Sequence, residues 1–202
     1  SAMAGGPARP RIVVVGAGFG GLWAARTLAR ELNPAQADVL LLDQNNYHTF
    51  FPLLYQVAAA ELAPSDIAYP VRSILRRSPG VSFRMAAVTG VDLAARTVDI
   101  GTERIPYDRL VLATGSEMPP LPVPGADEHA WNIDTFDAAV ALDRHLAALA
   151  AAPDAPGRDT VVIIGGGMTG IELAAEMRTR LAVHFGEAQA AGMRVVLVER
   201  AD

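Results

Sequence analysis

The chain has 202 residues, with 17 basic and 22 acidic side chains and a formal net charge of -5. All of the basic residues are arginines and there is no cysteine, which excludes disulfides, thiolate metal sites, cysteine nucleophiles and lysine Schiff bases. The acidic balance argues against a nucleic-acid partner, because phosphate neutralisation needs a basic face. Four scattered histidines lack metal-ligand spacing, so no metal site is predicted and surface or loop positions are expected for them.

The N-terminal residues carry no targeting or membrane signal. Residues 1–10 are interpreted as an expression remnant and a flexible lead-in, and we set them aside from the fold. The longest uncharged apolar run, residues 12–25, is too short to span a bilayer. We therefore expect a cytoplasmic protein.

The first part of the chain predicts a parallel α/β sheet. A β-branched run at residues 11–15 indicates a buried strand, apolar residues at helical spacing indicate a helix over 22–32, and residues 39–42 form a second strand. Residues 45–70 contain several aromatic residues and prolines, which predicts a loop region. Ser65 and Asp66 then offer an N-cap for a short helix that runs to residue 77.

The pattern changes to short alternating segments between residues 81 and 105. Segments at 81–84, 88–93 and 96–100 predict a small antiparallel β-meander inserted into the α/β unit. The remaining predicted elements are a strand over 110–113, a linker with four prolines over 118–127, a helix over 134–151 with Asp134 as its cap, a second linker over 153–157, a strand over 160–164, a helix over 171–185 and a strand over 195–198.

Two glycine-rich turns satisfy the pattern G-x-G-x-x-G. Each follows a β-branched strand, opens a helix and precedes a strand that ends in an acid, Asp43 or Glu199. The first glycine allows the tight turn, the second lets the backbone approach a pyrophosphate, and the third lets the helix pack against the strand. The phosphate then lies on the helix N-terminus. Two copies predict two dinucleotide sites, whereas a methyltransferase-like α/β fold would explain only one. The glycines are Gly16, Gly18 and Gly21 in the first turn, and Gly165, Gly167 and Gly170 in the second.

These turns flank the sequence LVLATGS at residues 110–116, an arrangement that resembles the two-dinucleotide flavoproteins, in which the first site holds FAD and the second NAD(P)H. Within that superfamily, DQNNYH at 43–48, PLLYQVA at 52–58 and GGGMTGIE at 165–172 are similar to the type II NADH dehydrogenases. These are single-subunit NADH:quinone oxidoreductases of the respiratory chain on the inner face of bacterial membranes. Disulfide reductases of the superfamily carry a C-x4-C pair where this chain has residues 45–52, so their chemistry is excluded, and sulfide:quinone oxidoreductases are disfavoured for the same reason.

The resemblance implies an FAD site and an NADH site. In the second, Glu199 on the adenosine ribose would favour NADH over NADPH, although the adjacent Arg200 weakens that expectation. Glu172 resembles the family glutamate near the nicotinamide and flavin and is the predicted catalytic residue, with helix capping as the open alternative. The implied FAD residues are Gly16, Gly18, Phe19, Gly20 and Gly21 on the pyrophosphate, Asp43 and Gln44 at the ribose, Val88 at the adenine, Ala113, Thr114 and Gly115 beside the flavin, and Pro52, Leu53, Tyr55 and Gln56 near the isoalloxazine. The implied NADH residues are Gly165, Gly167, Thr169, Gly170 and Glu199.

The predicted fold class is α/β, with a Rossmann-like FAD-binding unit, its meander insertion, and the first βαβ unit of a second, NAD-binding domain. The expected boundaries are an FAD-binding domain over 11–117, a linker and helix over 118–157 and an incomplete NAD-binding domain over 158–202. We interpret the chain as an N-terminal fragment, incompetent for full turnover, of an enzyme that passes electrons from NADH to a quinone. The parent would touch the membrane only through its missing C-terminal part.

Two alternatives stay open at this point. One is another NAD(P)H-dependent FAD reductase without redox cysteines. The other is a nucleotide-binding module without turnover, in which a homodimer would cover the open sheet edges.

Overall fold

The computed structural model describes residues 9–53, 64–117 and 123–200. The chain divides into two compact units, one formed by residues 1–49 and 68–116 and the other by residues 50–67 and 117–202. We call them unit 1 and unit 2 and describe each by itself. The assignment of an FAD-binding domain, a linker and an NAD-binding domain to particular ranges stays a prediction.

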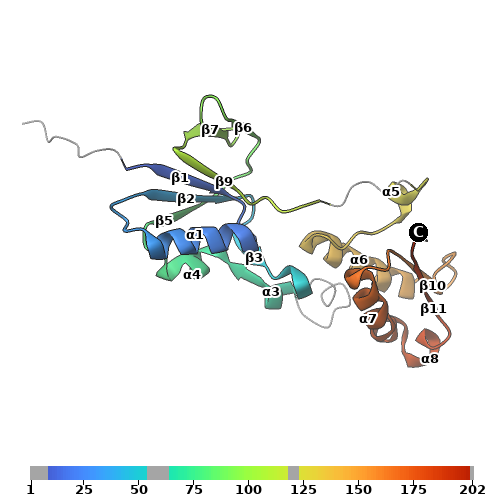
Figure 1. Ribbon diagram of the computed structural model, residues 1–202. Helices are drawn as coiled ribbons and strands as arrows, with labels where there is room; N and C mark the ends of the chain where they lie inside the picture. Colours follow the sequence, from blue (N-terminus) through green and yellow to red (C-terminus); the bar gives the residue numbers. More distant parts are fainter. Residues whose placement is uncertain (1–8, 54–63, 118–122, 201–202) are drawn as a thin grey trace, which may run out of the picture. The chain divides into compact units, whose positions relative to one another are not determined.

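Unit 1 is built around a four-stranded parallel sheet in the order β5-β2-β1-β9 (Figure 1). Strand β1 lies between β2 and β9, and its last residue, Val15, is opposite Leu42 of β2 on one side and Leu112 of β9 on the other. The carboxyl ends of these strands therefore meet at one edge of the sheet, where ligands bind in open α/β folds. The strands are β1 (Arg11–Val15), β2 (Asp38–Asp43), β5 (Val81–Met85) and β9 (Arg109–Leu112).

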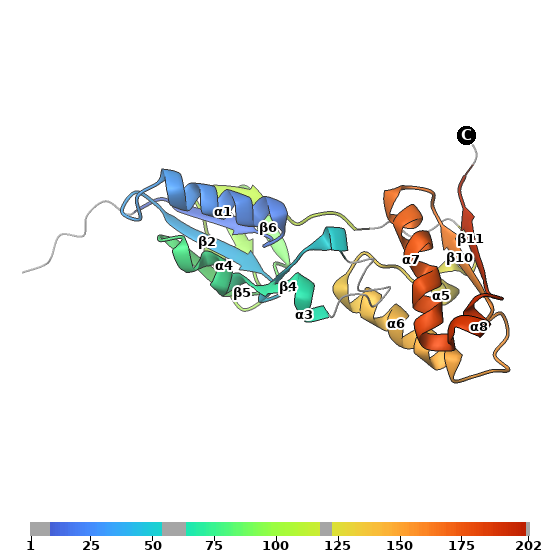
Figure 2. The ribbon, with the colours of Figure 1, turned by 90° about the horizontal axis from the view of Figure 1, so that it is seen from below.

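Helices pack on one face of this sheet, and an antiparallel meander packs on the other. Helices α1 (Phe19–Glu31) and α4 (Val71–Ile74) lie on one face, where Val14, Leu41 and Ala25 form part of the core (Figures 1 and 2). A three-stranded antiparallel meander lies on the other face, over Val13 and Leu42. The two central strands β1 and β2 are thus buried on both sides, as their near-continuous apolar sequences require. The meander consists of β6 (Gly90–Asp92), β7 (Thr97–Asp99) and β8 (Arg104–Pro106).

The sequence placed the first strand of the meander wrongly. Residues 81–84 belong to β5, which pairs in parallel with β2 at the edge of the large sheet. Val81 and Phe83 pack toward the helices while Ser82 and Arg84 are exposed. An edge strand with one covered face shows the same two-residue alternation as an antiparallel strand, so the pattern alone could not separate the two.

The segment between β2 and β5 contains more structure than the predicted loop. A two-stranded antiparallel sheet joins β3 (Tyr47–Thr49) to β4 (Ala68–Pro70), with His48 opposite Tyr69. The predicted helix from Ser65 to residue 77 is also wrong, because Pro70 lacks an N–H and interrupts it. In its place lie α3 (Pro64–Ile67), β4, α4 with Pro70 as its N-cap, and the 3₁₀ helix η2 (Leu75–Arg77).

Unit 2 contains a parallel pair of strands packed against helices. β10 (Thr160–Ile164) and β11 (Arg194–Val198) pair in register, and Met177 and Leu181 of α7 are almost fully buried in the adjoining core. Leu146 of α6 and Ile67 at the end of α3 join the same core. The helices are α5 (Ala126–His129), α6 (Phe136–Ala150), α7 (Met168–Phe185) and α8 (Glu187–Ala190), and the 3₁₀ helix η1 (Phe51–Leu53) also belongs to this unit.

The cap predicted for α6 is displaced by one residue. Thr135, not Asp134, is the N-cap, and its Oγ1 accepts a hydrogen bond of 3.2 Å from the backbone N–H of Ala138. Threonine and aspartate are both favourable N-cap residues, so the sequence alone does not determine whether Asp134 or Thr135 caps the helix.

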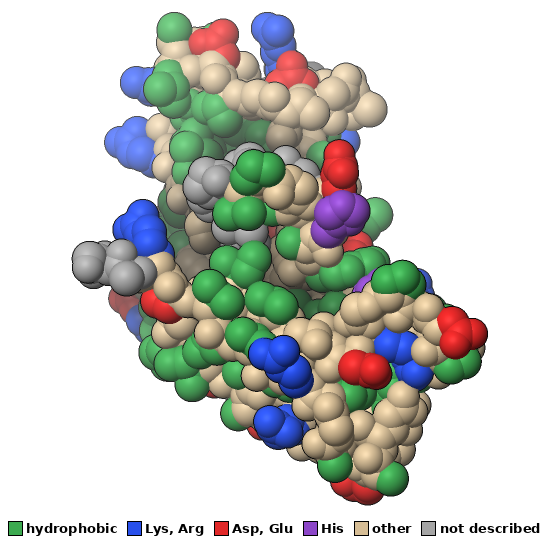
Figure 3. Space-filling view, turned by 90° about the vertical axis from the view of Figure 1, so that its right-hand side faces the viewer, with side chains coloured by type: hydrophobic (Ala, Val, Ile, Leu, Met, Phe, Trp, Pro, Cys, Tyr) green, Lys and Arg blue, Asp and Glu red, His purple; other side chains and the backbone are tan. Residues whose placement is uncertain are grey.

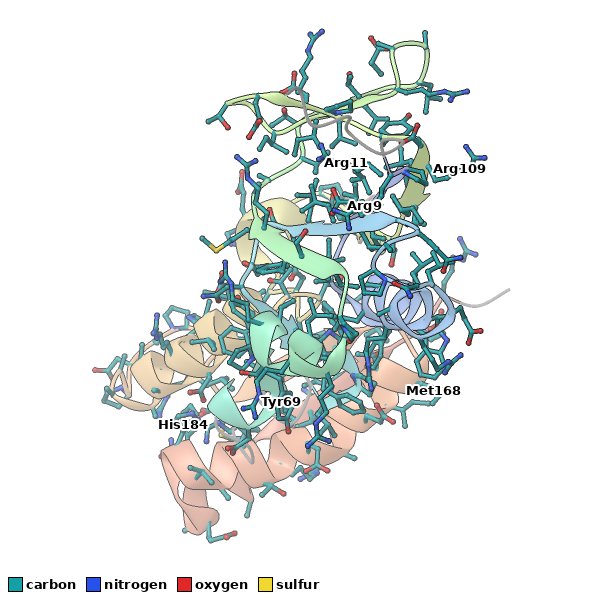
Figure 4. The ribbon with its side chains drawn as sticks, turned by 90° about the vertical axis from the view of Figure 1, so that its left-hand side faces the viewer. Arg9, Arg11, Tyr69, Arg109, Met168 and His184 are labelled. Atoms are coloured by element: carbon teal, nitrogen blue, oxygen red, sulfur yellow. The ribbon has the colours of Figure 1, made fainter. Side chains whose placement is uncertain are left out.

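Unit 2 exposes much apolar surface. Val162 and Ile164 project from the face of β10 opposite the buried Ile163, and Met168 at the start of α7 is 79% exposed. Figure 3 shows exposed hydrophobic side chains, drawn green, on one face of the molecule, and Figure 4 labels Met168 in the opposite view. No helix of the described ranges is long and apolar enough to cross a membrane.

Candidate functional site

The first glycine turn connects β1 to α1, and two of its glycines are required by the chain itself. Gly16 has a φ of +100°, and a Cβ there would collide with the carbonyl oxygen of Ala113. A Cβ on Gly21 would collide with the carbonyl oxygen of Gly16. The tight turn and the close approach of helix to strand therefore account for both residues.

The middle glycine is not required by any protein contact. Gly18 has a φ of -70° and a ψ of -168°, which any residue adopts. Apart from Gly18 itself and its two neighbours in the chain, no described residue has a heavy atom within 4 Å of the position that a Cβ on Gly18 would occupy. Close approach of a ligand explains the missing side chain, so this cradle fits a nucleotide pyrophosphate.

The second turn, between β10 and α7, repeats this geometry. Gly165 has a φ of +108°, a Cβ on Gly170 would collide with the carbonyl oxygen of Gly165, and Gly167 faces open space. The first glycine of each turn also donates its N–H to the strand that ends in the acid. Gly16 donates to Leu42 at 2.7 Å, and Gly165 donates to Val198 at 2.8 Å.

Both turns lead into helices whose first N–H groups lack side-chain caps. Gly18 is the N-cap of α1 and Gly167 is the N-cap of α7, and neither provides a side-chain acceptor. Neither helix has an acidic residue in its first turn. A helix N-terminus without a side-chain cap, together with the helix dipole, favours an anion at each position.

The acid at the end of each following strand is hydrogen-bonded to the glycine turn. Asp43 Oδ2 accepts from the Ala17 N–H at 2.6 Å, and its Oδ1 accepts from the Asn45 N–H at 2.7 Å. Glu199 accepts from the N–H groups of Gly166 and Arg200 in the same manner. The hydrogen bond from Gly166, followed by that from Arg200, lowers the pKa of Glu199. Each carboxylate is therefore held beside its glycine turn, and its contact with a ribose stays a prediction.

His48 contacts the first glycine turn, a placement that sequence reasoning missed. We expected a surface or loop histidine, but His48 is buried on β3 and its Nδ1 lies 3.0 Å from the carbonyl oxygen of Ala17. Its ring packs edge-to-face against Phe19, with 4.9 Å between centroids. A three-residue strand has no periodicity that would have predicted this burial.

The structure brings other predicted residues of unit 1 to the same edge of the sheet. Ala113 donates its N–H to Val15 at 2.8 Å and lies against the first glycine turn. The segment that leads to Val88 begins where the N–H of Ala86 donates to the Asp43 carbonyl at 2.8 Å. Val88 itself packs against the core beneath the meander. Gln44, Thr114 and Gly115 are exposed, and Gly20 is the second residue of α1.

The residues predicted to approach the isoalloxazine are not gathered at this edge by unit 1. Pro52 and Leu53 form part of η1 in unit 2, where Leu53 packs against the core cluster that contains Ile67. Tyr55 and Gln56 lie outside the described residues.

Two predicted residues of the second site belong to α7. Thr169 is exposed in the first turn of the helix, and Glu172 is half-buried at the fifth position. Because the first turn of α7 contains no acid, the alternative interpretation of Glu172 as a capping residue is wrong. Its assignment near the nicotinamide stays a prediction.

A charged cluster joins α6 to α7 in unit 2. Asp143 accepts from Arg180 Nη2 and from His184 Nε2, the latter at 2.9 Å. Burial lowers the pKa of Arg180, and burial followed by the charge of Arg180 lowers the pKa of His184. His184 is therefore not the surface residue that the sequence suggested. Within the described ranges, no three acidic or histidine side chains are arranged to hold a metal ion.

Comparison with known proteins agrees with this geometry. A NADH dehydrogenase-like protein of Mycobacterium tuberculosis is 37% identical over 197 residues, and a type II NADH:quinone oxidoreductase of Staphylococcus haemolyticus is 33% identical over 178 residues. These matches cover 94% and 86% of this chain but 47% and 44% of the relatives, so the chain spans about half of their length.

Solved structures share the fold. The structure of NDH2 from Plasmodium falciparum in complex with NADH has a TM-score of 0.78 and 20% identity, and the match covers 94% of this chain and 42% of that one. The family model described as pyridine nucleotide-disulphide oxidoreductase matches residues 10–202. With Rossmann-like α/β architecture, two equivalent glycine turns and this match over nearly its whole length, the chain belongs to the pyridine nucleotide-disulphide oxidoreductase family.

Proposed function

We propose that the chain carries the FAD-binding and NADH-binding turns of a flavoprotein that oxidises NADH and passes electrons to a quinone. The observation that carries the proposal is the equivalence of the two glycine turns. In both, the first and third glycines are required by the backbone of the protein, and the second leaves an open space that suits the close approach of a ligand. A chain with one such glycine turn would bind a single nucleotide. Two such turns would allow the chain to bind both an electron-donating nucleotide and a resident cofactor.

The choice of substrates rests on the relatives. Those aligned over most of this chain are named as NADH dehydrogenase-like proteins and type II NADH:quinone oxidoreductases, and a protein of the same fold has been solved with NADH. A quinone acceptor also suits the composition. The chain has no cysteine, so its own residues cannot exchange thiols with a disulfide.

The protein's part in such a reaction is to bind and orient two nucleotides. FAD, when bound, supplies hydride acceptance and electron transfer. The open cradles at Gly18 and Gly167 bind pyrophosphates, and the N-termini of α1 and α7 stabilise their charge. Asp43 and Glu199 accept hydrogen bonds from the ribose hydroxyls. We assign Glu172 to the neighbourhood of the nicotinamide.

The location follows from the same proposal. An enzyme that reduces a membrane quinone must meet the membrane surface, and we propose peripheral contact on the inner face of a bacterial membrane. Parts of the relatives that lie outside the aligned half would make this contact.

The visible spectrum of the purified chain tests the proposed function. After incubation with FAD and gel filtration, we expect a flavin absorbance band that bleaches when NADH is added without oxygen, and that bleaches more slowly with NADPH. A chain that retains FAD without bleaching would be a nucleotide-binding module without turnover. A chain that retains no FAD and shows no change in flavin fluorescence on titration would contradict the FAD assignment.

A further inference from the structure

The first glycine turn is held by two side chains, each on a different peptide group. Asp43 accepts the N–H of Ala17 and so fixes the Gly16–Ala17 peptide. His48 Nδ1 contacts the carbonyl oxygen of Ala17 at 3.0 Å and so fixes the Ala17–Gly18 peptide. Because a carbonyl oxygen only accepts, Nδ1 of His48 must carry the hydrogen.

The bond from His48 determines the direction of a backbone donor in the cradle. All peptides of the described chain are trans, so the N–H of Gly18 points opposite to the carbonyl of Ala17. No acceptor for the Gly18 N–H exists among the described residues. Rotation of this peptide would turn a carbonyl oxygen toward the place of an anionic ligand.

His48 is well placed to prevent that rotation. Its side chain is 9% exposed, and its ring is kept in position by Phe19 at the start of α1 and by the pairing of β3 with β4. Ala17 is 2% exposed, so water cannot readily replace the donor. A buried carbonyl without a donor is costly, which biases the turn toward the bonded arrangement.

We call the hydrogen bond from His48 to the Ala17 carbonyl the brace of the first turn. Among the described residues, the second glycine turn has no equivalent hydrogen bond. Glu199 accepts from Gly166 as Asp43 does from Ala17. In the part of the chain that the structure describes, however, no side chain donates to the carbonyl of Gly166. The two turns share the positive φ of the first glycine, the close approach at the third glycine and the hydrogen bond to the acid, so the brace is a difference that acts directly on the peptide of the ligand cradle.

We propose that His48 is a positioning residue that locks the Ala17–Gly18 peptide of the first turn and thereby makes that site retain its dinucleotide, while the unbraced second turn exchanges its own. The inference rests on the proposed function, in which the first site holds a resident cofactor and the second a substrate. The inference assigns the different retention of the two nucleotides to one residue, His48, and to its hydrogen bond with the first turn.

The test compares FAD binding and release in His48→Asn, His48→Gln and His48→Leu. The amide nitrogen of asparagine lies near the position of Nδ1, whereas that of glutamine lies near Nε2. We expect His48→Leu and His48→Gln to weaken FAD binding and to speed FAD release about tenfold, the effect of one lost hydrogen bond. His48→Asn should recover most of the wild-type affinity.

Two controls accompany the experiment. His129→Leu, at an exposed histidine, should leave FAD binding unchanged. NADH binding to the second turn should be the same in every His48 variant, which separates a local effect from general damage. Equal FAD retention by wild type and His48→Leu, or equal recovery by asparagine and glutamine, would overturn the inference alone. A wild-type chain that binds no FAD would instead overturn the proposed function.

Discussion

The carboxylate of Asp43 and the backbone N–H of Ala17 are joined by a hydrogen bond of 2.6 Å. The acid at the end of β2 is therefore a structural part of the glycine turn as well as the predicted ribose ligand. Glu199 and Gly166 repeat the relationship at the end of β11. Each acid thus links the position of the ribose to the position of the pyrophosphate.

Replacing Asp43 should harm both the turn and its ligand. Asp43→Ala leaves the N–H groups of Ala17 and Asn45 without their acceptor, and we expect a loss of about 1–3 kcal/mol in the free energy of unfolding together with weaker FAD binding. Urea denaturation and FAD titration measure the two effects. Asp38→Ala is the matched control on the same strand, because Asp38 forms only a partly exposed ion pair with Arg11 and should cost less than about 1 kcal/mol. Equal losses in the two variants would contradict the role given to Asp43.

The glycines of one turn should respond differently to substitution. Gly18→Val adds a side chain where the protein leaves space, so the ligand-free chain should keep its melting temperature but lose FAD binding. Gly21→Ala forces a Cβ into the carbonyl of Gly16, so the chain should unfold at a clearly lower temperature with or without ligand.

The same pair of experiments can be made on the second turn. Gly167→Val should abolish NADH binding at unchanged stability, and Gly170→Ala should destabilise unit 2. Calorimetry of each variant with and without its nucleotide separates the two effects. Undiminished FAD binding by Gly18→Val would show that the cradle has another purpose.

The strands and glycine turns were predictable because their information is local. A β-branched run such as 11–15 is buried on both faces of the sheet, and glycine is required where φ is near +100° at Gly16 and Gly165. β5 was misplaced because alternation reports one covered face and not the direction of the neighbouring strand. The helix expected up to residue 77 is interrupted at Pro70, because proline has no N–H to donate within a helix.

The residues of the candidate site could be predicted where they lie at a fixed spacing from a glycine turn. They could not be predicted where their position depends on packing between segments that are far apart in the sequence. Asp43 ends β2 and Glu199 directly follows β11, so the places of both acids could be inferred from spacing. His48 could not be found in this way, because its burial depends on the pairing of β3 with β4 and on contact with a turn far earlier in the chain. The cluster of Asp143, Arg180 and His184 likewise depends on the packing of α6 against α7.

Glu199 should determine the choice between the two nicotinamide nucleotides. The hydrogen bonds from Gly166 and Arg200 lower its pKa, so the carboxylate stays ionised at neutral pH and repels a 2′-phosphate. Glu199→Gln keeps an oxygen for the Gly166 N–H but removes the charge, and we expect the preference for NADH over NADPH to shrink several-fold. Titration with both nucleotides measures the ratio, and a preference for NADPH in the unsubstituted protein would contradict the ribose assignment.

The cluster of Asp143, Arg180 and His184 should make the stability of unit 2 depend on pH. Burial and the charge of Arg180 lower the pKa of His184 below its ordinary value of 6.5, so the unfolded chain binds the proton more readily than the folded one. Stability therefore rises with pH between the lowered pKa and 6.5, and it is lost as the pH falls through that range. Protonation in the folded state would add a second cation beside Arg180, with Asp143 as the shared acceptor.

His184→Gln tests this dependence, because the glutamine amide can still donate to Asp143 from near the position of Nε2 but does not titrate. Urea unfolding at pH 7.5 and pH 5.5, followed by the fluorescence of Trp131 in a Trp23→Phe background, reports on unit 2. We expect the wild-type midpoint to fall between these pH values by more than that of His184→Gln, and the exposed-site control His129→Gln to behave as wild type. Equal falls in wild type and His184→Gln would show that other groups cause the pH dependence, because the charge change at position 184 is the only titration that the substitution removes.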